Sequence, residues 1–562
     1  MSNHSDETSG EMDKEMNIIW KRLQATSDEM FRAIRRLAFG FAIREADDAS
    51  SVITTPTGDA VGVSQQSVPV LVGAVPSAIR DIFESHYAPE DMEPGDVIIT
   101  NDPWIGGGHL LDIVVITPIF YEGELVGLAG SLGNVDDIGG LSGAWLTEGS
   151  QVYEEGLIIP PTKLYEGSEK NQAVEDFIRS NVRLADQAMG DIEAMRSANN
   201  LGGTELRTML DEYGVDTYIE ATDAIIDKSE QALRRELDDI EDGTYESEYV
   251  YSVADILEGY DELKIDVSVT IDGSDVHVDF TGTSDQIPAG INCPYTNIVA
   301  VVQYIIRCMT VPDLDGSEGF YNPIEITAPE RTLVNPTRPV ATDSRHLVYF
   351  PAEFALVKAL GKAMPDKLVS DFSGGLQILN VTGTTDQGQE FIGIGLGCKP
   401  GVAHTHRDGS GVTHFPSNAK LVSVEMMEQY NPIIYESTNK VPDTEGAGTY
   451  RSEFAPEWIV RNNMDESDVN LLVTSAAGAR RPEGVEGGHD GIMAEAELLD
   501  SDVDLSTSGR AVLPPDERVR LLRSSPGGYG DPTERDTEQI ERDMEIGLLS
   551  EERAREVYGY DG

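Results

Sequence analysis

The spacing of apolar residues along the chain predicts helices at its beginning, in its middle and at its end. From Met12 to about Gly40, apolar residues recur at helical spacing and form one broad stripe: Ile18, Ile19, Leu23, Met30, Ile34 and Leu37. Residues 171–237 show the same helical pattern, and shorter helices are expected near 76–86, 297–309 and 352–363. Two short helices are expected close to the C-terminus, at 538–545 and 551–558.

Alternation of apolar and polar residues predicts strands in the other regions. Residues 50–135 read as strands and glycine turns around the single helix at 76–86. In residues 245–282, apolar positions from Ile265 to Ile271 alternate with polar ones, Asp272-Gly273 forms a turn, and a second alternating run follows. His277 falls on the face opposite the apolar residues of that run, so we expect it to face solvent. Residues 375–500 read as mostly strands and loops.

These patterns together predict an α+β fold with several subdomains, mixed helices and largely antiparallel sheets. A chain of 562 residues is too long for one hydrophobic core. We therefore expect five parts: an α+β part at 1–165, a helical segment at 166–240, a β-hairpin and helix part at 241–370, a β-rich part at 371–515, and a glycine-rich tail with short helices at 516–562.

The chain is strongly acidic. It contains 100 Asp and Glu residues and 41 Lys and Arg residues, for a net charge of −59. The acidic residues are spread along the whole chain. At molar salt the Debye length is about 3 Å, so repulsion among so many carboxylates is screened. This predicts a protein from a halophile that accumulates salt. Nucleic acid is excluded as a partner because the charge has the wrong sign.

The sequence also predicts a cytoplasmic protein with no membrane partner. It contains no apolar run of about 18 residues. Its acidic start lacks the features of a secretion signal. The three cysteines show no CxxC spacing, which favours reduced thiols over a disulfide framework or a zinc cluster: Cys293, Cys308 and Cys398.

The segment from Asn101 to Asp112 reads NDPWIGGGHLLD and carries the main chemical candidates. Its three consecutive glycines allow the backbone to fold tightly around a small ligand. His109 and Asp112 are three residues apart and could both reach one divalent cation. A loop hydrogen bond is the commoner role for such a pair, so the spacing alone leaves both interpretations open.

Several short segments, in the same order along the chain, resemble the hydantoinase B family. That family includes the B subunits of ATP-dependent N-methylhydantoinases, the second half of 5-oxoprolinases and the alpha subunits of acetone carboxylases. Each match is weak alone, but together they cover nearly the whole chain. The matching segments are 44–48, 101–112, 137–140, 155–161, 181–183, 190–191, 292–294, 407–409, 446–448 and 526–532.

The resemblance implies a subunit of a hetero-oligomer. A hydantoinase A-type partner would bind ATP and phosphorylate a substrate oxygen, and this chain would complete the reaction. The chain itself has no Walker-type phosphate loop, which agrees with ATP being used by the partner. In the amidohydrolase branch the substrate is a hydantoin, oxoproline or other lactam, and in the carboxylase branch it is a ketone. A divalent metal such as Mn, Zn or Mg would suit either reaction.

The resemblance also assigns candidate residues, and here the chain departs from the family. His109 and Asp112 match metal ligands, but Asn134 stands where the family has a third, histidine ligand. Two further family histidines are replaced by Ser67 and Leu71. Three interpretations stay open: a harder metal aided by Asp136 or Asp137, a substrate that does not need these histidines, or a catalytically impaired scaffold subunit. Asp102 and Asp137 are the candidate catalytic carboxylates.

A second group of histidines surrounds Arg407-Asp408-Gly409: His404, His406 and His414. His404 and His406 could share one face of a strand and bind a metal. The resemblance in this region covers only the Arg-Asp-Gly segment, so we predict instead that His406, Arg407 and Asp408 shape the substrate-binding site or the subunit interface. The leading prediction is a lactam-opening B-type subunit, and the alternatives are an acetone-carboxylase-like alpha subunit and a scaffold.

Overall fold

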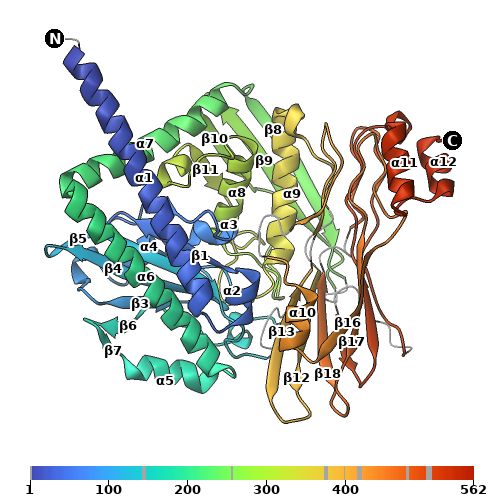
Figure 1. Ribbon diagram of the computed structural model, residues 1–562, viewed down its shortest axis with the longest axis horizontal. Coiled ribbons are helices and arrows are strands. Elements are labelled where there is room, and N and C mark those ends of the chain that lie inside the picture. Colours follow the sequence, from blue (N-terminus) through green and yellow to red (C-terminus); the bar gives the residue numbers. More distant parts are fainter. Residues whose placement is uncertain are drawn as a thin grey trace. The chain divides into compact units, whose positions relative to one another are not determined.

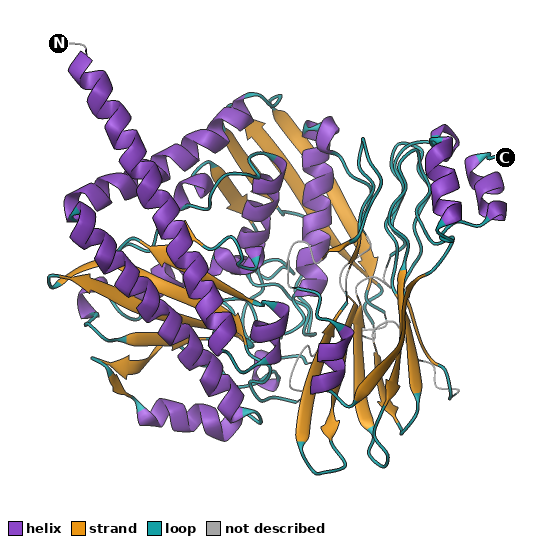
Figure 2. Ribbon diagram, viewed as in Figure 1, coloured by secondary structure: helices purple, strands orange, loops and turns teal. Residues whose placement is uncertain are grey.

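A computed structural model describes residues 3–141, 147, 149–254, 257, 259–372, 377–397, 399–413, 420–475, 480–501, 505 and 509–562. It confirms the predicted α+β class, with helices and several mostly antiparallel sheets (Figure 1 and Figure 2). The chain forms two compact units. Unit 1 comprises Met1–Thr244, Val269–Asp279 and Asn292–Arg345, and unit 2 comprises Tyr245–Ser268, Phe280–Ile291 and His346–Gly562.

Unit 1 is built around a seven-stranded sheet with the strand order β2-β1-β5-β4-β3-β6-β7. All neighbouring strands in it are antiparallel. The two longest strands, β4 and β5, are buried over most of their length, because helices cover both faces. The strands are β1 (Ala49–Thr54), β2 (Ala60–Val63), β3 (Val97–Thr100), β4 (Asp112–Tyr121), β5 (Glu124–Asn134), β6 (Thr162–Glu166) and β7 (Glu169–Lys170).

Glycines on β5 show how closely these helices approach the sheet. A side chain at Gly133 would meet Met195 of α6 (Ala185–Tyr213), whereas one at Gly130 would meet Val75 of α4 (Ala74–Ser85). Residues 130 and 133 point to opposite faces of a strand. Helix α1 (Asn3–Leu37) lies beside α6 across the strands (Figure 1). The helices predicted from 12 to 40 and near 76–86 are thereby confirmed.

Unit 1 also contains the predicted helical region and part of the predicted hairpin. The hairpin of β9 (Glu262–Asp272) and β10 (Asp275–Asp279) turns at 272–273, as expected. Strand β10 pairs in parallel with β11 (Ile324–Thr327). His277 is partly buried, with Nε2 2.8 Å from the Thr327 hydroxyl, so it is less open to solvent than expected. The other helices of this unit are α2 (Phe41–Ala46), α3 (Pro69–Val72), α5 (Gln172–Asn181), α7 (Val215–Asp238) and α8 (Tyr295–Met309).

Unit 2 is rich in strands, as predicted for residues 375–500. Two four-stranded sheets, β13-β12-β18-β20 and β16-β17-β21-β19, share one apolar cluster to which both contribute side chains. They form a sandwich. The strands are β12 (Gln377–Thr384), β13 (Glu390–Leu396), β16 (Ile433–Lys440), β17 (Pro456–Asn462), β18 (Val469–Ser475), β19 (Glu495–Leu498), β20 (Gly509–Leu513) and β21 (Arg518–Leu522). Smaller elements are β8 (Gly243–Ser252), β14 (Lys399–Pro400), β15 (Val412–Thr413), α9 (His346–Ala363) and α10 (Val424–Tyr430).

The chain ends in two short helices, α11 (Thr537–Glu545) and α12 (Glu551–Tyr558), which confirm the predicted ones. They pack through a small apolar cluster made by Ala447, Ile540, Leu549, Ala554 and Tyr558. Among the residues that the structure describes, no helix is both long enough and apolar enough to cross a membrane.

We expect the melting temperature of the protein to rise with salt concentration. Lowering the salt from molar to about 0.1 M lengthens the Debye length from about 3 Å to about 10 Å. Repulsion among the excess carboxylates then reaches farther and destabilises the folded state. Thermal melting followed by circular dichroism across a potassium chloride series measures this. A melting temperature that stays constant across the series would contradict the halophile interpretation.

Candidate functional site

The sheet of unit 1 brings three predicted ligands together. Asp112 is the first residue of β4 and Asn134 is the last residue of β5, and the two are direct partners in the antiparallel ladder. His109 lies in the loop just before β4. All three side chains are buried, with exposures of 0% for His109, 1% for Asp112 and 2% for Asn134. Antiparallel register therefore explains how residues 22 positions apart meet.

Their polar atoms form a compact triangle. Asn134 Nδ2 lies 2.9 Å from His109 Nε2 and 3.0 Å from Asp112 Oδ1. His109 Nε2 lies 3.2 Å from the same Asp112 oxygen. Two ligand atoms at right angles, each about 2.1 Å from one ion, are about 3.0 Å apart. The three separations are therefore short enough for all three side chains to hold one divalent ion.

The Asn134 amide can supply oxygen to this triangle. Its Oδ1 is buried and has no hydrogen-bond partner among the described residues. A half-turn of the amide would exchange Oδ1 with Nδ2 and place an oxygen beside His109 and Asp112. Burial and the charge of Arg345 oppose protonation of His109, but Asp112 and Asp343 outweigh them and raise its pKa. Metal binding at Nε2 requires the neutral ring, so it would release any proton held there.

The neighbours of His109 fix how its ring is presented. Its Nδ1 lies 3.0 Å from the backbone oxygen of Asp343, an acceptor, so Nδ1 carries the proton and donates it. In the neutral ring this leaves the lone pair on Nε2, inside the triangle. Backbone carbonyls commonly orient metal-binding histidines in this way. Asp343 lies 234 positions from His109, and no local sequence pattern indicated its role.

Asp48 is another carboxylate beside the triangle that sequence reasoning did not single out. Its backbone oxygen accepts the Asn134 N–H at 3.1 Å. Burial, followed by the negative charge of Asp112, raises the pKa of Asp48 to about 7, while His109 and Arg345 act in the opposite direction. Asp48 belongs to the 44–48 segment, which resembles the family. The sequence alone predicted no chemical role for that segment.

Taken together, the donor set fits a hard divalent ion. It offers one imidazole nitrogen, one carboxylate oxygen and one amide oxygen, with the Asp48 carboxylate nearby. Among the described residues, no three His, Cys, Asp or Glu side chains form a cluster suited to a metal. The amide of Asn134 is therefore needed to complete a third ligand position.

The glycines of the 106–108 loop make room for neighbouring side chains, whereas their sequence suggested a tight fold around a small ligand. A Cβ at Gly107 would lie 2.3 Å from Asp112 Oδ2, and one at Gly108 would lie 1.5 Å from Asn297 Oδ1. Gly108 also has a φ of +90°, which L side chains rarely adopt. The loop therefore packs its bare backbone against the side chains of the site.

The two candidate catalytic carboxylates are both held by hydrogen bonds. Asp137 accepts from the backbone N–H groups of Gly139 and Leu184, and its Oδ1 lies 2.8 Å from Arg183 Nη1. Both of its oxygens are thus occupied in tying the 137–140 turn to the start of α6.

Asp102 accepts the Trp104 N–H at 3.1 Å and pairs with Arg338, whose guanidinium lies 4.5 Å from the centre of a Trp104 ring. The catalytic roles of Asp102 and Asp137 stay predictions.

Three further positions named from the sequence, Asp136, Ser67 and Leu71, have structural roles. Asp136, a suggested helper ligand, accepts the backbone N–H groups of Phe41 and Ala42 at the start of α2. Ser67 Oγ accepts the Ser51 N–H, and Leu71 belongs to the apolar core. At the two positions that lack the family's histidines, Ser67 therefore makes a backbone hydrogen bond and Leu71 packs in the core.

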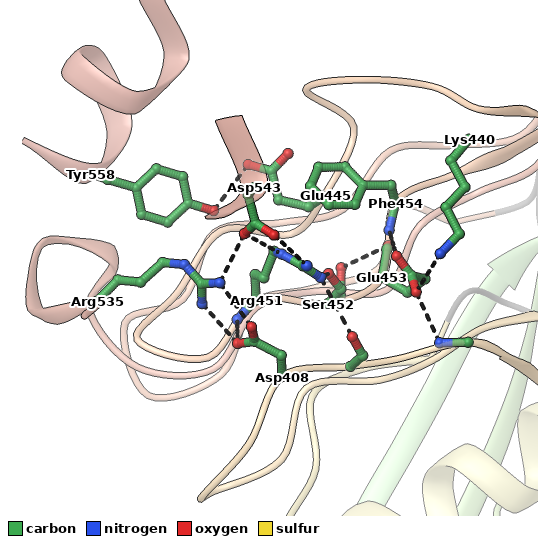
Figure 3. Close-up of polar contacts among 12 residues, drawn as sticks. Asp408, Lys440, Glu445, Arg451, Ser452, Glu453, Phe454, Arg535, Asp543 and Tyr558 are labelled. Atoms are coloured by element: carbon green, nitrogen blue, oxygen red, sulfur yellow. Dashed lines mark hydrogen bonds and ion pairs between the residues drawn. The ribbon is translucent and has the colours of Figure 1, made fainter. Parts of the chain in front are cut away.

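The predicted substrate-binding residues 406–408 belong to unit 2. Both oxygens of Asp408 pair with Arg535, at 2.7 Å and 2.8 Å, and its Oδ1 also accepts the Arg451 N–H (Figure 3). His406 and Arg407 are exposed. Burial and the charge of Arg407 lower the pKa of His404 to about 4. His414 lies outside the described residues, and a role for 406–408 in substrate binding stays a prediction.

Comparison with known proteins confirms the family resemblance. Residues 13–532 match the model of the hydantoinase B/oxoprolinase family. The chain belongs to this family. It is 27% identical over 569 residues to the B component of a putative D-/L-hydantoinase from a Pseudomonas species, covering 97% of this chain and 94% of that one.

Two solved structures share the family member's fold. One is the ATP-dependent caprolactamase of Pseudomonas jessenii, with a TM-score of 0.87 and 23% identity over 97% of this chain and 96% of that one. The other is an acetone carboxylase, with a TM-score of 0.86 and 17% identity over 97% of this chain and 79% of that one. At these identities the likeness shows the fold alone.

Proposed function

We propose that this family member is the B-type subunit of a two-subunit, ATP-dependent cyclic amide hydrolase. It would open a hydantoin, an oxoproline or another lactam after a hydantoinase A-type partner has phosphorylated the amide oxygen. The observation that carries the proposal is the buried triangle of His109, Asp112 and Asn134, whose spacing suits a divalent ion. The names of two relatives, a hydantoinase component and a caprolactamase, support the substrate class.

The triangle suits the reaction that follows phosphorylation. Water adds to the ring carbon, the C–N bond breaks, the nitrogen takes up a proton, and phosphate is released by a further water. A divalent ion held by His109, Asp112 and Asn134 would lower the pKa of a coordinated water and stabilise negative charge on oxygen. Asp343 keeps the His109 lone pair facing inward, and Asp48 adds a second carboxylate beside it.

The partner's role is tested by assembling the complex. The isolated chain should neither bind nor hydrolyse ATP, because its sequence has no phosphate loop and its charge repels a triphosphate. Co-expressed with its A-type partner, it should form ADP only when a cyclic amide is present, together with ring-opened product. Hydantoin, 5-oxoproline and caprolactam are the first substrates to try, with product followed by mass spectrometry.

A ketone with bicarbonate serves as the discriminating substrate in the same assay. If it stimulates ADP formation and gives a carboxylated product while every cyclic amide fails, the chain is an acetone-carboxylase-like alpha subunit. The fold it shares with an acetone carboxylase makes this comparison necessary.

A further inference from the structure

Arg345 places a buried positive charge against the triangle but uses only part of its guanidinium there. Its Nη2 donates to Asp112 Oδ2 at 2.6 Å, and its Nε donates to Asn297 Oδ1 at 2.8 Å. A guanidinium has five N–H groups. Nη1 forms no hydrogen bond among the described residues, although only 5% of the side chain is exposed. Nη1 itself is not fully buried, so this end of the guanidinium keeps N–H donors that remain available to a ligand.

Asn297 adds a second unpaired donor at the same place. Its Oδ1 is held by Arg345, while its Nδ2 is buried and has no partner among the described residues. The side chain has no exposed surface. The neighbouring Thr296 hydroxyl is likewise buried and without a partner in the described part of the chain. Two adjacent residues thus keep polar side-chain groups that no described residue satisfies.

Both residues stand at the N-terminus of α8, a helix of 15 residues. The first N–H groups of a helix lack partners within it, and the helix dipole makes this end partially positive. Such ends bind anions well when side-chain donors are added. Gly108 contributes by having no side chain, since a Cβ there would occupy the position of Asn297 Oδ1.

We propose that Arg345, Asn297 and the N-terminus of α8 form an oxyanion subsite that binds the phosphoryl group of the activated substrate. The identity of the ligand rests on the function proposed above, in which the partner supplies a phosphorylated amide. The planar guanidinium end matches two phosphate oxygens, and the Asn297 amide can donate to a third. Because Asp112 belongs to the triangle and also accepts from Arg345, the phosphoryl group would lie directly beside the metal ligands.

The subsite is tested with inorganic phosphate on the isolated full-length chain, without ATP, lactam or partner. Binding is followed by phosphorus NMR and by calorimetry at constant potassium chloride. Asn297→Asp keeps the oxygen that holds Arg345 but replaces the unpaired N–H donors by an acceptor, so phosphate should bind at least about tenfold more weakly. Arg345→Lys keeps the charge but loses the planar pair of donors, and it should weaken binding to a similar extent.

Asn200→Asp provides the matched control. It makes the same chemical change at an exposed position on α6, and it should leave phosphate binding within about twofold of wild type. Melting curves of all variants show that each is folded. Sulfate should compete with phosphate, because it is also a tetrahedral anion, and acetate should compete poorly.

Three results would overturn the subsite: no saturable phosphate binding by the wild type, equal binding by Asn297→Asp, or competition by acetate as strong as that by sulfate. The last would indicate a carboxylate site. The outcome does not depend on the proposed function, because lactam and partner are absent. The complex could fail to turn over any cyclic amide while Asn297→Asp still weakens phosphate binding by the isolated chain. That result would refute the proposed hydrolase function and would still support the oxyanion subsite.

Discussion

Replacing His109 by alanine should remove the bound divalent ion and stop ring opening in the assembled complex. His109 provides the only imidazole of the triangle, and its loss leaves Asp112 and the weakly binding amide of Asn134. Changes outside the ligand shell commonly cost 10–100-fold in metal affinity, and loss of a ligand should cost more. A metal contributes several kcal/mol to the transition state, so turnover should fall by at least about a thousandfold.

Metal analysis and product analysis check this prediction together. Wild-type protein should carry about one divalent ion by elemental analysis after dialysis, and His109→Ala should carry almost none. His86→Ala is the matched control, because it removes an exposed histidine of the same unit. If the His109 variant opens the ring as fast as wild type, the chain acts as a scaffold for its partner and the catalytic role is wrong.

Asn134→His tests the same metal site by replacing a weak ligand with a stronger one. Imidazole binds most divalent transition metals more strongly than an amide oxygen does. Because position 134 lies opposite Asp112 in the ladder, a histidine there should raise metal affinity if the triangle is a metal site. Unchanged affinity would mean that the side chain at this position never reaches an ion.

Strong local patterns explain which parts of the fold the sequence could predict. Helix α12 begins and ends at the predicted residues, because its spacing and its Ser550 cap are both local signals. Helix α9, by contrast, begins at His346 and not at Ala352. It contains Pro351 and is buried nearly all round, so its sequence offers neither a clear polar face nor a clear start.

Long-range contacts explain what the sequence could not predict. The family resemblance identified His109, Asp112 and Asn134, and the strand register then showed why they meet. Arg345 and Asn297 lie more than 180 positions beyond His109, and no spacing links them to it. The parallel pairing of β10 with β11 and the interleaved segments of the two units arise in the same way, from contacts between distant parts of the chain.

Replacing Arg535 by methionine should destabilise unit 2 strongly, even in molar salt. Arg535 is 1% exposed and carries the positive charge between two carboxylates, Asp408 and Asp543, the latter at 2.9 Å (Figure 3). Arg451 also pairs with Asp543, so Asp543 keeps one arginine partner after the substitution. Asp408 loses the arginine side chain that pairs with it. Removing one partner of a buried ion pair typically costs about 3–5 kcal/mol.

The measurement is denaturant unfolding in molar potassium chloride, with hydrogen exchange to locate the loosened segment. Salt screens exposed charges far more than buried ones, so this loss should persist where the repulsion between surface carboxylates is already suppressed. Arg542→Met is the matched control: it removes an exposed arginine from α11, and it should change stability by no more than about 0.5 kcal/mol.

A second substitution separates the structural role of Asp408 from its predicted role in substrate binding. The Asp408 side chain is 22% exposed, so its charge is only partly buried. Adding Asp408→Asn to Arg535→Met removes this unpaired charge, so the double variant should recover part of the lost stability. Asp408→Asn alone should then lower stability, and turnover per folded complex should remain near wild type if the residue only anchors the loop. Equal unfolding of Arg535→Met and Arg542→Met would show that the network contributes nothing. A loss of turnover without loss of stability in Asp408→Asn would instead support the substrate-binding prediction.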